Sequence, residues 1–196
     1  MIAFVFGKFV VKNPTQVIVD VNGVGYDCNI SLNTYSAISN LNEGKLFTYL
    51  HITENGHTLF GFADTSEKQL FMQLISVSGV GASTARVMLS GMKPDELIQA
   101  IVQGNVKQLE SVKGIGKKTA ERLIVELKDK LSKYSYETDN FSAASFKNNL
   151  VSDAIQALVS LGIAKPIAEN AINKVKSSNE QVIPLEDLIK LALKNL

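Results

Sequence analysis

The sequence of 196 residues predicts an α+β chain built from several domains. Three observations lead to this fold class. Residues 1–63 are rich in β-forming residues and turn dipeptides, a short segment with two glycines occurs twice between residues 74 and 121, and residues 150–196 carry three short apolar patterns of helical period. We therefore expect an N-terminal β-barrel, a central all-α domain and a C-terminal three-helix bundle.

The N-terminal domain, residues 1–63, is expected to consist of short strands. Residues 2–6 and 16–21 are mostly β-formers and end at turn residues, and residues 45–51 and 57–62 flank a further turn. Asn22-Gly23 and Asn55-Gly56 are dipeptides typical of tight hairpins. About five strands in so short a segment indicate a small closed barrel, and the oligonucleotide-binding fold (OB-fold) fits best.

The central domain, residues 64–134, contains the repeat. Leu74–Arg86 returns as Leu109–Glu121, 35 residues later, with Leu, Ser, Val, both Gly, Thr and Ala in register. Each copy predicts a helix, a tight turn and a second helix that begins directly after the second glycine. Residues 66–75 carry a helix start and an apolar stripe, and Pro94 suits the first turn of a further helix.

The glycine turn of each copy is suited to holding a phosphate. Glycine permits a positive φ and the close approach of another group, while Val80 or Ile115 between the glycines can point into the core and hold the turn. The first amides of the following helix have no partner within it, and together with the helix dipole they attract an anion. The alternative is an ordinary αα-hairpin whose glycine only caps a helix.

Basic residues strengthen the second copy. Lys117 and Lys118 fall in the first helical turn, where cations oppose the dipole, so an anion is expected in front of them. Arg122 shares roughly the same face, although it can instead pair with Glu126 at i, i+4. Residues 111–118 do not form an ATP-binding P-loop, because Ser111 stands where Gly is needed and Lys118 where Ser or Thr is needed. The glycines also follow a helical pattern and no strand, which excludes a dinucleotide-binding turn.

The pattern is therefore the helix-hairpin-helix of sequence-independent DNA binding, in which amides and cations contact phosphates. The predicted DNA-binding residues are Gly79, Val80, Gly81, Ser83, Arg86, Gly114, Ile115, Gly116, Lys117, Lys118, Thr119 and Arg122.

Composition narrows the remaining functions. The net charge is +1, but residues 64–134 carry eleven Lys and Arg against eight acids, so the positive excess falls on the two hairpins. A single cysteine, Cys28, indicates a reducing compartment, and the first residues lack the features of a signal peptide, so we expect a cytoplasmic protein. No membrane span, catalytic constellation, metal site or cofactor is predicted.

The C-terminal part consists of a linker and a bundle. Residues 135–149 are mostly polar without a clear period and are expected to form a flexible linker, although Phe141 and Phe146 could dock a structured loop. Residues 150–196 predict three helices. The first ends at Leu161-Gly162, the second begins at Pro166 and the third begins at Pro184. A bundle this small on a linker is typical of an interaction module. The predicted partner-binding residues are Leu158, Leu161, Leu188 and Leu191.

The order of these domains, over the whole chain, resembles the RuvA family of Holliday-junction-binding subunits. The motifs that carry the resemblance are Gly23-Val24-Gly25-Tyr26, Leu59-Phe60-Gly61-Phe62, Gly79-Val80-Gly81, Leu89-Ser90-Gly91-Met92 and the run Gly114–Lys128. The resemblance implies a homotetramer, or an octamer of two facing tetramers, that holds four-way junction DNA flat without catalysis. It also implies that the tail recruits the hexameric ATPase RuvB for branch migration in recombination, DNA repair and the SOS response to DNA damage. A junction resolvase is a further candidate partner.

Two positions depart from the family pattern. The family often carries a basic residue where Ser83 stands, so the first hairpin is expected to rely on amides and on Arg86. The family also places two neighbouring acids on a barrel hairpin at the junction centre, where this chain has Glu54 followed by Asn55. These two residues are the predicted junction-centre pin, and the alternative is that Glu54-Asn55-Gly56 is only a good hairpin turn.

Two other functions fit parts of the sequence. One is a small helix-hairpin-helix DNA-repair enzyme, which would need a catalytic Asp or Lys in a pocket or a carboxylate cluster for Mg²⁺. The other is a general single-strand binder that uses the barrel. Strand cleavage of damaged DNA would favour the first, and a preference for single strands would favour the second.

Overall fold

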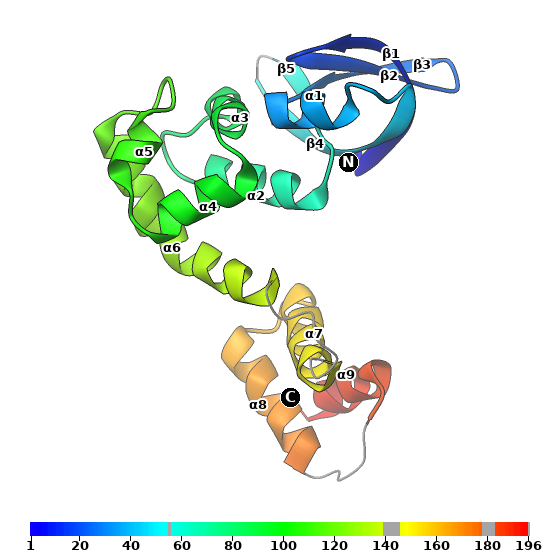
Figure 1. Cartoon of the computed structure of the whole chain (residues 1–196). Coiled ribbons are helices and arrows are strands. Elements are labelled where there is room, and N and C mark those ends of the chain that lie inside the picture. The colour runs from blue at the N-terminus through cyan, green and yellow to red at the C-terminus, as the bar shows by residue number, and fades with distance from the viewer. Residues whose placement is uncertain (55, 139–145, 178–182, 196) are drawn as a thin grey trace. The chain divides into compact units, whose positions relative to one another are not determined.

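The computed structural model describes residues 1–54, 56–138, 146–177 and 183–195 (Figure 1). The chain divides into two compact units, Met1–Ser135 and Tyr136–Leu196, and each is described by itself.

The first unit begins with a closed five-stranded barrel, as predicted. Its strands are β1 (Phe4–Asn13), β2 (Gln16–Val21), β3 (Val24–Asn29), β4 (Glu43–Thr53) and β5 (Gly56–Phe62), in the order β1-β2-β3-β5-β4. The β1–β4 pair closes the barrel antiparallel, and β3 and β5 run parallel. With the helix α1 (Leu32–Ile38) between β3 and β4, this is the topology of the OB-fold.

The barrel follows from alternation and turn chemistry. Side chains at alternate positions point inward and are buried, among them Val5, Val17, Val19 and Leu46. At the β2–β3 hairpin, Asn22 has φ 53° and Gly23 has φ 87°, the left-handed pair that a tight hairpin requires.

Two features of the barrel differ from the predictions. The first strand continues through Gly7 to Asn13 and does not end at the glycine. Gly7 is needed inside the strand because a Cβ there would lie 2.1 Å from the carbonyl oxygen of Asp20 on β2. The helix α1 was not predicted, because seven residues are too few for a periodic pattern. Its one local signal is the N-cap Ser31, whose hydroxyl accepts a hydrogen bond from the Thr34 amide at 3.0 Å.

Five helices follow the barrel, and the last of them continues past the end of the first unit: α2 (Thr65–Ile75), α3 (Ala82–Gly91), α4 (Pro94–Val102), α5 (Val106–Glu110) and α6 (Lys117–Thr138). Their apolar faces share one core, which also takes in Phe60 and Phe62 from β5. The ring centroid of Phe71 on α2 lies 5.0 Å from the centroids of both Phe60 and Phe62. The barrel and the hairpin region are therefore packed against each other through aromatic side chains.

The second unit contains the three helices expected from the sequence: α7 (Phe146–Ser160), α8 (Lys165–Ser177) and α9 (Leu185–Lys194). Buried Ala154, Leu158, Ile172 and Leu188 form its core. Gly162, with φ 91°, lies two residues past the end of α7.

The predicted linker, residues 135–149, overlaps helices at both ends, because α6 runs to Thr138 and α7 begins at Phe146. Residues 139–145 lie outside the described residues. The boundaries at residues 63, 134 and 149 stay predictions.

Candidate nucleic-acid interface

The two glycine turns are built alike in three dimensions as well as in sequence. The helix before each turn ends at Ile75 in the first copy and at Glu110 in the second, and the helix after it begins at Ala82 and at Lys117. Each of these pairs is separated by the same 35 residues as the sequence repeat. The prediction that the second helix starts directly after the second glycine is therefore confirmed for both copies.

The hydrogen bonds of the turns also correspond. The Val80 amide donates to the Val77 carbonyl at 3.0 Å, and the Ile115 amide donates to the Val112 carbonyl at 3.1 Å. The first glycines, Gly79 and Gly114, have φ of 92° and 93°. Each turn is thus a closed loop whose first glycine position can be occupied without strain only by glycine.

The first glycine of each turn does not cap the preceding helix. The helix C-caps are Ser76 and Ser111, three residues before Gly79 and Gly114. The part of the αα-hairpin alternative that makes this glycine a helix C-cap is therefore wrong, and phosphate binding by the turn stays a prediction.

The residue between the glycines holds the turn from inside. Val80 and Ile115 are 4% and 5% exposed and belong to the core of the first unit. Their side chains are unavailable to a ligand and their amides are already used within the turn. We therefore revise the predicted DNA-binding role of these two residues to a structural one.

The outer surface of each turn is open. A Cβ placed on Gly79, Gly81, Gly114 or Gly116 would meet no atom within 4 Å. The carbonyls of Gly81 and Gly116 accept the first helical hydrogen bonds, from Ala85 at 2.9 Å and Ala120 at 3.0 Å. The starts of α3 and α6 therefore lie next to open space at the positive end of a helix dipole, an arrangement that suits a phosphate oxygen.

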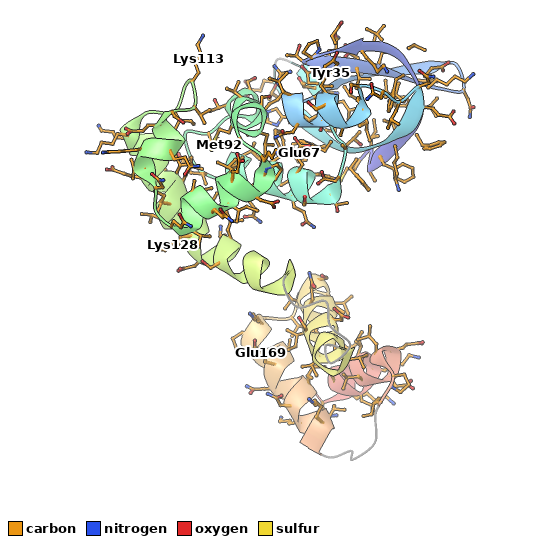
Figure 2. All side chains as sticks on the ribbon, viewed as in Figure 1. Tyr35, Glu67, Met92, Lys113, Lys128 and Glu169 are labelled. Atoms are coloured by element: carbon orange, nitrogen blue, oxygen red, sulfur yellow. The ribbon has the colours of Figure 1, made fainter. Side chains whose placement is uncertain are left out.

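Three lysines surround the second turn. Lys117 and Lys118 are exposed in the first turn of α6, as predicted, and Thr119 beside them is partly buried with its amide bonded to the Gly116 carbonyl at 3.0 Å. Lys113 is exposed one residue before Gly114 and projects from the loop between α5 and α6 (Figure 2). Lys113 is not among the predicted DNA-binding residues, although the repeat places it opposite Ser78 of the first copy and so marks it as a cation that only the second copy carries.

Arg122 connects the two hairpins. Its Nη1 donates to the carbonyl of Ser78, in the first turn, at 3.0 Å, and its Nε lies 3.9 Å from Glu126 Oε1. The predicted pairing with Glu126 is thus present, but it is loose and about half exposed, which leaves it a weak interaction. Arg122 brings a positive charge beside the first turn, whose own exposed helix start carries Ser83 in place of a basic residue.

The guanidinium of Arg86 contacts the barrel and not the first glycine turn. Its Nη1 donates to Asn29 Oδ1 at 2.6 Å and to the Thr15 carbonyl at 3.3 Å, both on the barrel. The expectation that Arg86 serves the first glycine turn therefore needs correction, because its guanidinium faces the barrel.

Two buried titratable groups lie apart from the two glycine turns. Burial, with a smaller contribution from Asp27, raises the pKa of the Cys28 thiol to about 12, so Cys28 is an inert core residue. Glu67 is 1% exposed, and burial raises its pKa against the opposing effect of hydrogen bonds from Ser31 and Thr34. Within the described ranges, no three His, Cys, Asp or Glu side chains gather as metal ligands would, and no helix is long and apolar enough to cross a membrane.

Comparison with known proteins places this architecture in a family. Residues 1–61 match the RuvA N terminal domain, residues 71–129 the SAM-like helix-hairpin-helix tandem, and residues 149–196 the RuvA C-terminal domain. The chain is 48% identical to the Holliday junction branch migration complex subunit RuvA of Cytophaga hutchinsonii, over 99% of both chains. It is 46% identical to the subunit of that name from Flavobacterium psychrophilum, over the full length of both.

The chain belongs to the RuvA family. The resemblance inferred from the motifs is thereby confirmed, together with the α+β class, the OB-fold barrel, the tandem hairpins and the helical tail.

The RuvA resemblance also predicted a junction-centre pin. Thr53 pairs with Gly56 in the β4–β5 register, so Glu54 lies at the tip of that hairpin, exposed to solvent. The prediction for Asn55 concerns a position outside the described residues. Thr53 Oγ1 donates to the Gly56 carbonyl at 3.0 Å and helps to close the hairpin.

The predicted partner-binding leucines of the RuvA-type tail separate into two groups. Leu158 and Leu188 are 0% and 4% exposed and belong to the bundle core, so these two assignments need correction. Leu161 is 64% exposed, and Leu191 is partly buried against the core. The helical periodicity predicted which faces are apolar. It did not distinguish the positions of each face that are buried in the core from those that stay exposed.

Proposed function

We propose that this chain binds four-way DNA junctions without sequence preference and delivers them to a RuvB-like ATPase for branch migration. The observation that carries the proposal is the pair of matched glycine turns, with open helix starts and the cations Lys113, Lys117, Lys118 and Arg122 around them. These groups can contact phosphates, but they offer no pattern of donors and acceptors for reading bases. The names of the RuvA relatives point to the Holliday junction as the DNA that is bound.

The chain performs no chemistry in this proposal, and the ATPase belongs to the partner. We further propose a homotetramer, because one protomer offers only two hairpins and a four-way junction presents four duplex arms. A second tetramer on the opposite face would give an octamer. The place of action is the cytoplasm, in recombinational repair and the SOS response.

A competition experiment tests the binding proposal. Four-way junction, duplex and single-stranded DNA of equal length compete for the full chain in a gel shift, and the mass of the free protein is measured in parallel. We expect the junction to compete best and the mass to be that of four chains. A preference for single strands, or cleavage of a strand, would favour one of the other two functions.

The tail is the proposed motor-binding unit. Its exposed apolar residues include Leu161 at 64% and Ile167 at 53%, close together in the chain around the turn between α7 and α8. We propose that these two residues replace Leu158 and Leu188 as the docking contacts, because the latter are buried in the core.

Truncation and point substitution test this part. A fragment that ends at Tyr134 should retain junction binding and lose stimulation of the motor. Leu161→Ser with Ile167→Ser should reproduce that loss in the full chain, while Asn170→Ala, on an exposed position of α8, should leave stimulation intact. Branch migration at the normal rate by the fragment would show that the motor docks elsewhere.

A further inference from the structure

Arg86 is held between the hairpin region and the barrel. It lies on α3, directly after the first glycine turn, yet its guanidinium donates to Asn29, at the end of β3, and to Thr15, between β1 and β2. The contact with Asn29 joins residues 57 positions apart at 2.6 Å. A short, directional bond of this kind fixes the relative placement of two elements more narrowly than apolar packing does.

A second set of bonds attaches α1 of the barrel to the same helix. Asn33 Nδ2 donates to the carbonyls of Leu89 and Met92, at 2.5 and 2.9 Å. The Leu32 amide donates to Ser90 Oγ at 3.1 Å, and the Ser90 hydroxyl donates to the Arg86 carbonyl at 2.8 Å. Residues 86, 89 and 90 are spaced three and four apart, so one face of α3 carries these contacts.

A third contact comes from Glu67 on α2, and Figure 2 shows this residue where the helices approach the barrel. The Glu67 carboxylate accepts hydrogen bonds from Ser31 Oγ and from Thr34 Oγ1, the latter at 2.6 Å. Thr34 Oγ1 in turn accepts from the Ala63 amide at 3.1 Å. The barrel is therefore attached to both helices of the first hairpin by polar bonds with defined geometry.

We propose that Arg86 is a positioning residue that, together with the Asn33 and Glu67 contacts, sets the angle between the barrel and the two hairpins, and thereby the selectivity for junction over duplex DNA. This inference rests on the proposed function. A duplex needs only the hairpins, whereas a junction that also meets the predicted junction-centre pin at Glu54 must fit the hairpins and that barrel hairpin at once. Loss of the bond to Asn29 releases the barrel at one point and lowers the fraction of molecules in which both parts fit the junction.

The opposing interpretation is that Arg86 binds phosphate directly once DNA is present. The two interpretations differ in the salt dependence of binding. A lost phosphate contact lowers the slope of log K against log salt by about 0.9 for every DNA, whereas a lost positioning bond leaves the slope on duplex unchanged.

The experiment compares Arg86→Ala, Asn29→Ala and the double variant in the full chain, with Lys118→Ala as the phosphate-contact control. Affinities for junction and for duplex are measured over a range of salt. We expect Arg86→Ala and Asn29→Ala each to keep the duplex affinity and slope and to lose about tenfold in junction affinity, as happens when the competent arrangement falls to about one tenth of the population. The double variant should be no worse than either single one.

Two results would overturn the proposal. A lower salt slope on duplex for Arg86→Ala, with Asn29→Ala like the wild type, would show a phosphate contact and overturn the proposal. Unchanged junction preference in both single variants would overturn it as well.

A second measurement does not depend on DNA. Spin labels on cysteines introduced at Lys8 of β1 and Lys107 of α5, with Cys28 replaced by Ala, report the distance between barrel and hairpins in the free protein. We expect Asn29→Ala to broaden that distance distribution. An unbroadened distribution would overturn the positioning role, whereas broadening without any junction binding by the wild type would refute only the proposed function.

Discussion

Removing the lysines of the second hairpin should weaken DNA binding while making the protein more stable. Lys117→Ala with Lys118→Ala deletes two exposed cations from the first turn of α6. Both charges oppose the positive end of the helix dipole, and each such placement costs about 0.3–1 kcal/mol of stability at low salt. The double variant should therefore melt at a higher temperature than the wild type.

The effect on binding follows from counterion release. Each lost contact with a duplex phosphate lowers the slope of log K against log salt by about 0.9. Two contacts remove about 1.8 from the slope for each hairpin that engages DNA. Between about 50 and about 200 mM salt, the wild type should lose about twelvefold more affinity per engaged hairpin than the variant.

The assay is a salt titration of junction binding with several unrelated arm sequences, together with thermal melts. The slope should fall by the same amount for every sequence, since phosphates carry no base information. Lys128→Ala with Lys130→Ala is the matched control, because it removes the same charge from exposed positions of the same helix about 17 Å further along. The control should leave the slope close to that of the wild type.

Two results would refute the reasoning. An unchanged slope in the Lys117 and Lys118 variant would mean that neither lysine contacts phosphate. A lower melting temperature would mean that these side chains stabilise the fold, and the loss of binding would then not report on the interface.

Three further predictions concern single residues. Gly116→Ala should leave the fold intact, because a Cβ there meets no atom within 4 Å. The added methyl group should keep a phosphate away from the amides and weaken junction binding about tenfold or more. Thermal melts measure the effect on the fold, and gel shifts measure the effect on binding. Glu54→Gln should tighten junction binding at low salt and relax the preference for junction over duplex, while Asn55→Asp should do the reverse. Equal binding by the wild type and both variants would show that the β4–β5 hairpin serves only as a turn. Glu67 has its pKa raised by burial, so its contribution to stability is fully present below the usual value of 4.5 and is lost as the pH rises through the raised pKa. Melts from pH 4 to pH 8 should therefore show Glu67→Gln gaining stability relative to the wild type as the pH rises, and parallel curves would contradict this.

Sequence alone determined the parts of this protein whose cause is local. The two hairpins follow from glycines that must adopt a positive φ, from an apolar residue between them, and from the helix start after the second glycine. The Asn22-Gly23 turn and the alternation of buried residues likewise follow from neighbouring side chains and the chain's own geometry. These features need no knowledge of what lies across the fold.

Tertiary structure decided the rest, since the deciding partners are far away in the chain. From the sequence, Gly7 is predicted to end a strand. In the fold, the carbonyl oxygen of Asp20 on β2 would lie 2.1 Å from a Cβ at this position, which explains the glycine inside the strand. Leu158 and Leu161 differ by three positions on one apolar pattern, but packing within the bundle buries the first and leaves the second exposed. Arg86 reads as a phosphate contact beside a glycine turn, and only the folded barrel brings Asn29, 57 residues away, within a hydrogen bond of it. A long cationic side chain reaches whichever acceptor the fold puts in range, and sequence spacing carries no information on that choice.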